Sequence, residues 1–86
     1  MDDIKTETEQ VMKNLGAVLK AAGLGYEHVV KCSIFMSSMD HYAKVNEVYG
    51  RYFTNEPPAR EAVAVKTLPK EVNVEISAIA VRSSGL

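Results

Sequence analysis

The order of hydrophobic and polar positions predicts five elements of secondary structure. Apolar residues recur at three- and four-residue steps over residues 4–22 and 40–53, which is the period of an amphipathic α-helix. Apolar and β-branched residues in alternation predict strands over residues 28–36, 60–67 and 72–81. The predicted order is therefore helix, strand, helix, strand, strand.

Each predicted helix has a recognisable end or beginning. Gly23 follows the first helix as a typical C-terminal stop, and Asp40 is a good N-cap for the second. The buried face of the first helix is predicted to carry four residues, Val11, Leu15, Val18 and Ala22.

The three strands and two helices predict a two-layer α+β sandwich with both helices on one face of the sheet. The strand over residues 28–36 is apolar on both faces, so it is expected at the centre of the sheet. Residues 68–71 form a turn, and a simple hairpin would pair the last two strands there. The face without helices is only half polar, which favours burial against another subunit.

Composition and charge narrow the class of protein. The 86 residues are expected to form a single domain, 1–86, because 47% of them are hydrophobic and 24% charged. A formal net charge of −1 gives no electrostatic reason to expect a nucleic-acid or anionic-membrane partner. The longest uncharged apolar run, residues 32–39, is too short to span a bilayer, and a lone cysteine favours a reducing compartment. We therefore expect a cytoplasmic protein.

Several residue types that often carry chemistry are expected to be structural here. His28 and His41 lack the spacing of a metal-ligand set, so no metal site is expected. Cys32 lies in an apolar strand, which favours core packing over a nucleophilic role. The glycines match no phosphate-binding loop, and Gly16 is expected to permit the close approach of another backbone segment.

Arg60 is the first candidate for a binding residue. Two prolines in the segment 57–60 stiffen the approach to it, and a guanidinium held in place binds a carboxylate through two parallel hydrogen bonds. The alternative is a strand-edge arginine paired with a nearby acid, Glu56 or Glu61.

Glu75 is the second candidate, because its chain neighbours are apolar. A carboxyl in apolar surroundings favours its protonated form, which suits general acid–base chemistry. The alternative is a glutamate on the polar face of its strand, beside Asn73 and Ser77. In a simple hairpin Arg60 would lie opposite residue 79, about 13 Å along the strand from Glu75. A site shared by the two residues is therefore expected between subunits.

Several motifs together resemble the RidA/YjgF family in order and spacing. They are Val29-Val30-Lys31, Met39-Asp40, Val45-Asn46-Glu47-Val48-Tyr49, Pro58-Ala59-Arg60, Leu68-Pro69-Lys70 and Val74-Glu75-Ile76. The resemblance implies a chorismate-mutase-like fold and a homotrimer with active-site clefts between subunits. It also implies the hydrolysis of reactive 2-imino or enamine acids to 2-keto acids and ammonia, without a cofactor.

The resemblance also implies roles for single residues. Arg60 would bind the carboxylate of the substrate, and Glu75 would position the attacking water and transfer a proton. Asn46 matches a cleft position, although a helix residue bonded to a neighbouring loop is an equal alternative. Ala62 stands where many members have a cysteine, so its backbone could face the substrate. Family members usually carry further N-terminal strands, so the cleft is expected to be incomplete in this chain.

Three functions follow from these features. The first is the imine and enamine deaminase. The second is a non-catalytic trimeric module that binds small 2-keto acids through Arg60. The third is an RNA-directed activity, which the near-neutral charge disfavours.

Overall fold

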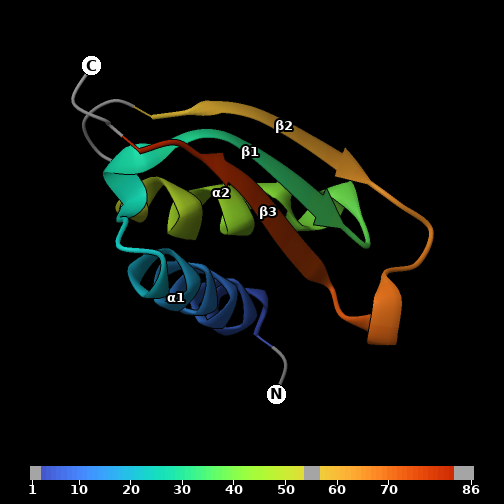
Figure 1. Ribbon diagram of the computed structural model, residues 1–86. Coiled ribbons are helices and arrows are strands. Elements are labelled where there is room, and N and C mark those ends of the chain that lie inside the picture. The colour runs from blue at the N-terminus through green and yellow to red at the C-terminus, as the bar shows by residue number, and fades with distance from the viewer. Residues whose placement is uncertain (1–2, 54–56, 83–86) are drawn as a thin grey trace.

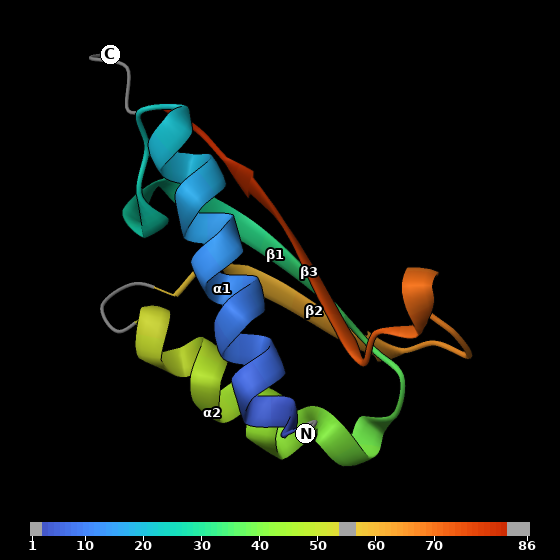
Figure 2. The ribbon, with the colours of Figure 1, turned by 90° about the horizontal axis from the view of Figure 1, so that it is seen from below.

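The computed structural model describes residues 3–53 and 57–82 and places two α-helices against one face of a three-stranded sheet (Figures 1 and 2). The helices are α1 (Ile4–Ala21) and α2 (Tyr42–Tyr52), and the strands are β1 (Val29–Met36), β2 (Ala59–Ala64) and β3 (Val74–Ala80). Three 3₁₀ turns connect them, at Tyr26–His28, Met39–His41 and Pro69–Glu71. The predicted α+β class and the order of elements are confirmed.

The strand order is β2-β1-β3, so β1 is central, as predicted. It pairs in parallel with β2 and antiparallel with β3. The predicted hairpin between the last two strands is wrong. Helix α2 is the crossover that a parallel β1–β2 pair requires, and the segment after β2 then carries the chain to the opposite edge of β1.

The buried face of α1 differs from the predicted one. Its buried residues are Ile4, Thr8, Met12 and Leu19, whereas Val18 is 67% exposed. The buried Thr8 hydroxyl is satisfied because it donates to the Ile4 carbonyl at 2.7 Å. Of the predicted stripe, Val11 and Leu15 are partly buried against the core. Together with Val18 they also border an open groove of about 420 Å³ between α1 and the free edge of β3. We call this the α1–β3 groove, and its apolar lining is Val11, Leu15, Val18, Val72, Val74 and Ile76.

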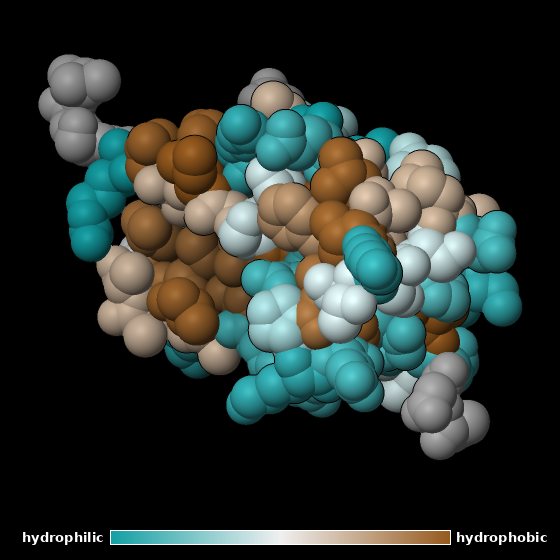
Figure 3. Space-filling view, turned by 90° about the vertical axis from the view of Figure 1, so that its right-hand side faces the viewer, coloured by the Kyte–Doolittle hydropathy of each residue, from teal (hydrophilic) through white to brown (hydrophobic). Residues whose placement is uncertain are grey.

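The space-filling view of the side with the α1–β3 groove shows a broad hydrophobic area next to hydrophilic ones (Figure 3).

The side chains of β3 that face the helices are Val74, Ile76, Ala78 and Ala80, as the alternation predicted. On β1 the same face carries Cys32, Ile34 and Met36. In a regular strand Val30 would share this face with Cys32, but it is 46% exposed, because the strand has an irregularity between Val29 and Lys31.

The caps explain where the helices begin and end. Gly23, at φ 78°, follows α1, and the Leu24 N–H donates to the Leu19 carbonyl at 2.8 Å, which closes the helix. The predicted cap of α2 is wrong. The Ser38 hydroxyl accepts the Asp40 N–H at 3.0 Å and starts a 3₁₀ turn, so Asp40 lies inside that turn and α2 begins only at Tyr42.

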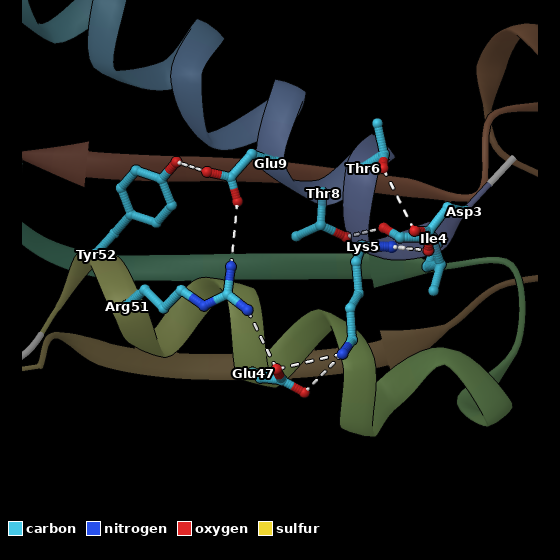
Figure 4. Close-up of polar contacts among 9 residues, drawn as sticks. All are labelled: Asp3, Ile4, Lys5, Thr6, Thr8, Glu9, Glu47, Arg51 and Tyr52. Atoms are coloured by element: carbon cyan, nitrogen blue, oxygen red, sulfur yellow. Dashed lines mark hydrogen bonds and ion pairs between the residues drawn. The ribbon is translucent and has the colours of Figure 1, made fainter. Parts of the chain in front are cut away.

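A polar network fixes α2 against α1 (Figure 4). The Tyr52 hydroxyl donates to Glu9 at 2.7 Å, and Arg51 lies 3.7 Å from Glu9 and 3.1 Å from Glu47. Lys5 adds a contact of 3.1 Å to Glu47. Lys5 first, and Arg51 second, lower the pKa of the Glu47 carboxyl. These contacts fix the position of α2, which carries several residues of the candidate site.

Two structural expectations concern the core. Cys32 is fully buried, which confirms its predicted packing role. Gly16 does permit a close approach, but by the Tyr26 side chain rather than by backbone, since the Tyr26 hydroxyl donates to the Met12 carbonyl at 2.6 Å.

Neither α1 nor α2 is both long and apolar enough to cross a membrane.

Candidate functional site

Arg60 is held by helix α2. It pairs with Cys32 of β1, and its side chain therefore lies on the helix-covered face of the sheet. One terminal nitrogen donates to the Tyr42 hydroxyl at 2.9 Å, and the other donates to the Asn46 side-chain oxygen. The guanidinium carbon lies 5.7 Å from the ring centre of Tyr42 and 5.2 Å from that of Tyr49.

This arrangement answers in part the question that the sequence left open about Arg60. Glu61, one of the two acids considered as its partner, accepts instead from the Ser33 hydroxyl at 3.0 Å on the other face of the sheet. Glu56, the second acid, lies outside the described residues. The partners of Arg60 among the described residues are neutral, so none of them compensates its positive charge.

Two of the side chains around Arg60, Tyr42 and Tyr49, were not among the predicted site residues. Both fall within the apolar periodicity of residues 40–53, which marked them only as helix residues. Together with Asn46 they stand at positions i, i+4 and i+7, which places all three on one helix face. An amide between two tyrosines at this spacing, followed by a stiffened arginine, is the signal that would have found them.

A pocket of about 400 Å³ opens beside the guanidinium, and we call it the Arg60 pocket. Its lining is Asn46, Tyr49, Gly50, Phe53, Pro57, Pro58 and Arg60. The pocket thus has a cationic, hydrogen-bonding end and an apolar end. Within residues 3–53 and 57–82, two of the five N–H donors of Arg60 are engaged, which leaves donors that could bind a carboxylate.

The floor of the site contains a buried thiol and a buried phenol. Burial raises the pKa of the Cys32 thiol, with smaller opposing effects from Tyr49 and Arg60. Burial, and then the neighbouring thiol, raise the pKa of the Tyr49 hydroxyl. Both groups therefore stay protonated at neutral pH and supply neither charge nor a nucleophile.

Glu75 does not approach Arg60 within the chain. It pairs with Phe35, three positions beyond Cys32, and so lies on the face of the sheet away from the helices. The offset is about 10 Å along the strands and about 10 Å across them. Glu75 is exposed and shares its face with Ser77, as the alternative predicted, although it also borders the apolar α1–β3 groove.

The other two predicted site residues lie on the Arg60 side. Asn46 accepts a hydrogen bond from Arg60 on β2 and also lines the Arg60 pocket. Ala62 pairs with Ile34 and is half-buried beneath the helices. The structure therefore brings Arg60, Asn46 and Ala62 to one face and leaves Glu75 on the other.

The described residues offer no metal-binding cluster of three or more histidine, cysteine or acidic side chains. His28 has a structural partner, because its Nδ1 atom accepts the Gly25 N–H at 2.9 Å. Only its second ring nitrogen is left for other contacts.

Comparison with known proteins identifies the family. The family model described as endoribonuclease L-PSP matches residues 1–82. The chain belongs to the endoribonuclease L-PSP family. Within this family the chain is 56% identical to protein DfrA of Myxococcus xanthus over 79 residues, which are 92% of this chain and 60% of DfrA. It is 46% identical to the 2-iminobutanoate/2-iminopropanoate deaminase of Mus musculus over 88% of this chain and 56% of that one.

Solved structures of L-PSP-family proteins share the fold. A Thermotoga maritima protein matches 98% of this chain with a TM-score of 0.94 and 48% identity, and the match covers 66% of that protein. The E. coli protein TdcF, solved with bound serine, matches 96% of this chain and 68% of its own, with a TM-score of 0.90 and 36% identity. The chain thus spans less than two thirds of the length of DfrA and of the mouse deaminase.

Proposed function

We propose that this protein binds small 2-imino and 2-keto acids at Arg60 and, as a homotrimer, hydrolyses the imino acids to 2-keto acids and ammonia. The observation that carries the proposal is the geometry of Arg60, whose guanidinium is positioned by Tyr42 and Asn46 at the mouth of a partly apolar pocket. The substrate carboxylate would take the free N–H donors, and its carbon side chain would lie along the apolar end. The mouse relative named a deaminase and the serine bound to TdcF both fit a small carboxylate ligand.

The reaction needs one water and no cofactor. Water adds to the C2 carbon of the imine and forms a carbinolamine, and the amino group is protonated and leaves as ammonia while the C2 hydroxyl becomes the keto group. An enamine such as 2-aminoacrylate first takes a proton on its methylene carbon to become the imine. A carboxylate that accepts a proton from the water and returns it to the nitrogen suits both transfers, and this is the role that we propose for Glu75.

Within one chain Glu75 lies on the wrong face for this role. The proposed active unit is therefore an assembly in which the open face of one sheet brings its Glu75 to the Arg60 pocket of a neighbour. Phe35, Val63 and Ile79 lie on that open face and would be buried by such an assembly.

A second function is favoured by the same separation of Arg60 and Glu75. If no neighbour supplies the carboxylate, the Arg60 pocket would still bind 2-keto acids without turnover. A relative named a putative regulator, AldR of Lactococcus lactis, is 44% identical over 92% of this chain.

Two measurements on the same protein test these proposals. The first is ammonia release from 2-aminoacrylate generated freshly from serine, and the second is titration with 2-ketobutyrate. The deaminase predicts turnover that Arg60→Ala abolishes, and the binding module predicts binding that Arg60→Ala abolishes, without turnover. Arg82→Ala, which removes a distant exposed arginine, should leave both signals intact. Signals that survive Arg60→Ala would refute both roles of Arg60.

A further inference from the structure

We propose that Gly50 holds open the rim of the Arg60 pocket, and that the residue at this position determines how long a side chain the bound acid can have. The inference rests on the proposed function and deepens it, because it names a specificity-determining residue and a substrate class. That class is 2-imino and 2-keto acids with an apolar side chain longer than a methyl group.

Nothing in the fold of the described residues requires glycine at position 50. It lies inside α2, where glycine is less favourable than alanine, and its φ is not positive. A Cβ atom built there meets no atom of the residues that the structure describes within 4 Å. Gly16 of α1 shows the contrast, since a Cβ there would meet the Tyr26 ring, 2.9 Å from its Cζ atom.

The position of Gly50 in the pocket supplies a reason. Helix α2 ends before Phe53, and the segment 57–60 lies beside the helix, with Arg60 bonded to Asn46. Gly50 is one turn beyond Asn46, about 6 Å along the helix axis, and so lies between the cationic and the apolar ends. A ligand whose carboxylate binds Arg60 would extend its side chain past this residue.

The direction of helical side chains makes the effect specific. A side chain on an α-helix leans toward the N-terminus and covers the preceding turn. A large residue at position 50 would therefore lie over the turn that begins at Asn46, across the mouth of the Arg60 pocket. A short acid would still reach Arg60, whereas a longer one would collide with the new side chain.

The test is a series of substitutions at one position, measured against acids of increasing size. Wild type, Gly50→Ala, Gly50→Met and Gly50→Leu would be titrated with pyruvate, 2-ketobutyrate and 4-methyl-2-oxopentanoate. For Gly50→Leu we expect the Kd of 4-methyl-2-oxopentanoate to rise about tenfold or more and that of pyruvate to change by less than about twofold. Gly50→Met should also raise the Kd of 4-methyl-2-oxopentanoate more than that of pyruvate, but by smaller factors than Gly50→Leu. Gly50→Ala should raise Tm by about 4 °C, because it gains helix propensity without a clash.

The controls separate this inference from the proposed function. Lys44→Leu adds the same side chain at an exposed position of α2 outside the pocket lining and should leave all three affinities unchanged. If the acids bind to wild type and not to Arg60→Ala, but Gly50→Leu affects all of them equally or none, the role of Gly50 is refuted and the proposed function stands. If Gly50→Leu changes the mass in solution, the glycine serves subunit packing and the inference is also refuted. If no acid binds to wild type, both proposals fail.

Discussion

Arg60 and Glu75 project from opposite faces of the same sheet, on strands separated by β1. Arg60 is aligned with Cys32, under the helices, and Glu75 with Phe35, on the open face. This relationship requires that any site using both residues take them from different chains. The catalytic proposal can therefore be tested without a structure of the assembly.

Mixing two inactive variants should restore activity. Arg60→Ala keeps Glu75, and Glu75→Gln keeps Arg60, so a mixed form of the proposed homotrimer would contain clefts in which both native residues meet. With random assortment about a quarter of the clefts would be complete, and activity should return to about that fraction of wild type. The measurement is ammonia release after the two proteins are unfolded and refolded together.

The matched control uses Glu61→Gln in place of Glu75→Gln, because Glu61 lies on the same open face of the sheet. Glu61→Gln alone should remain active. Mixtures of Arg60→Ala and Glu75→Gln that stay inactive while still forming trimers would contradict a site shared between subunits.

Gly16→Ala should destabilise the protein, because the new methyl group would collide with Tyr26. The Tyr26 ring lies 2.9 Å from the Cβ position and is tied to α1 by its hydrogen bond to the Met12 carbonyl. We expect a loss of about 1–3 kcal/mol in the free energy of unfolding, reduced by the gain in helix propensity. Urea denaturation measures it, and a Gly16→Ala protein as stable as wild type would show that Tyr26 relaxes freely.

Stability should fall above pH 10 because of Tyr52. Burial first, and then the hydrogen bond to Glu9, raise the pKa of the Tyr52 hydroxyl to about 12 in the folded protein. An unfolded tyrosine ionises near pH 10, so between about pH 10 and pH 12 the folded state holds more protons and the free energy of unfolding decreases as pH rises. Below pH 10 this contribution is fully present.

Urea titrations at pH 8.5 and pH 11 compare wild type with Tyr52→Phe. The variant should be less stable than wild type at pH 8.5 and should lose less stability on going to pH 11. Since burial also raises the pKa of Tyr49, some alkaline sensitivity should remain in the variant. Identical pH dependence in the two proteins would exclude Tyr52 as a source.

Lys70→Asn should stabilise the turn between β2 and β3. Lys70 and Glu71 have φ of 61° and 53°, in the left-handed region, where a side chain other than asparagine, aspartate or glycine is strained. Asparagine tolerates this conformation, and we expect a gain of about 0.5–1 kcal/mol. Thermal unfolding measures it, with Lys66→Asn, outside this left-handed pair, as the control expected to show no gain.

The sequence predicted the elements of the fold better than their pairing. Periodicity located both helices and all three strands, because it depends on local spacing alone. It did not reveal that the segment after Leu68 crosses to the far side of β1, since a short turn and a crossover use similar residues. Nor did it find the buried stripe of α1, where the choice between Met12 and Val11 depends on how the helix packs on the sheet.

The candidate site was predictable in part. The sequence singled out Arg60, because two prolines and a strand start restrict it, and Asn46 through its motif. The structure adds Tyr42 and brings the three side chains together. The environment of Glu75 was misjudged because apolar neighbours along a strand lie on its opposite face. Nothing in the sequence marked Gly50, because a single glycine within a helix can be linked to a pocket only when the structure shows that it lines one.

The strand order has a consequence for how the protein is made. β3 forms the antiparallel partner of the central strand, yet it is the last of the three to be synthesised. On the ribosome, β1, α2 and β2 emerge as a crossover unit whose central strand still lacks one neighbour. The three-stranded sheet can therefore be completed only after translation has passed Ala80. A chain terminated before that point would leave one edge of β1 unpaired and would be prone to aggregation and proteolysis.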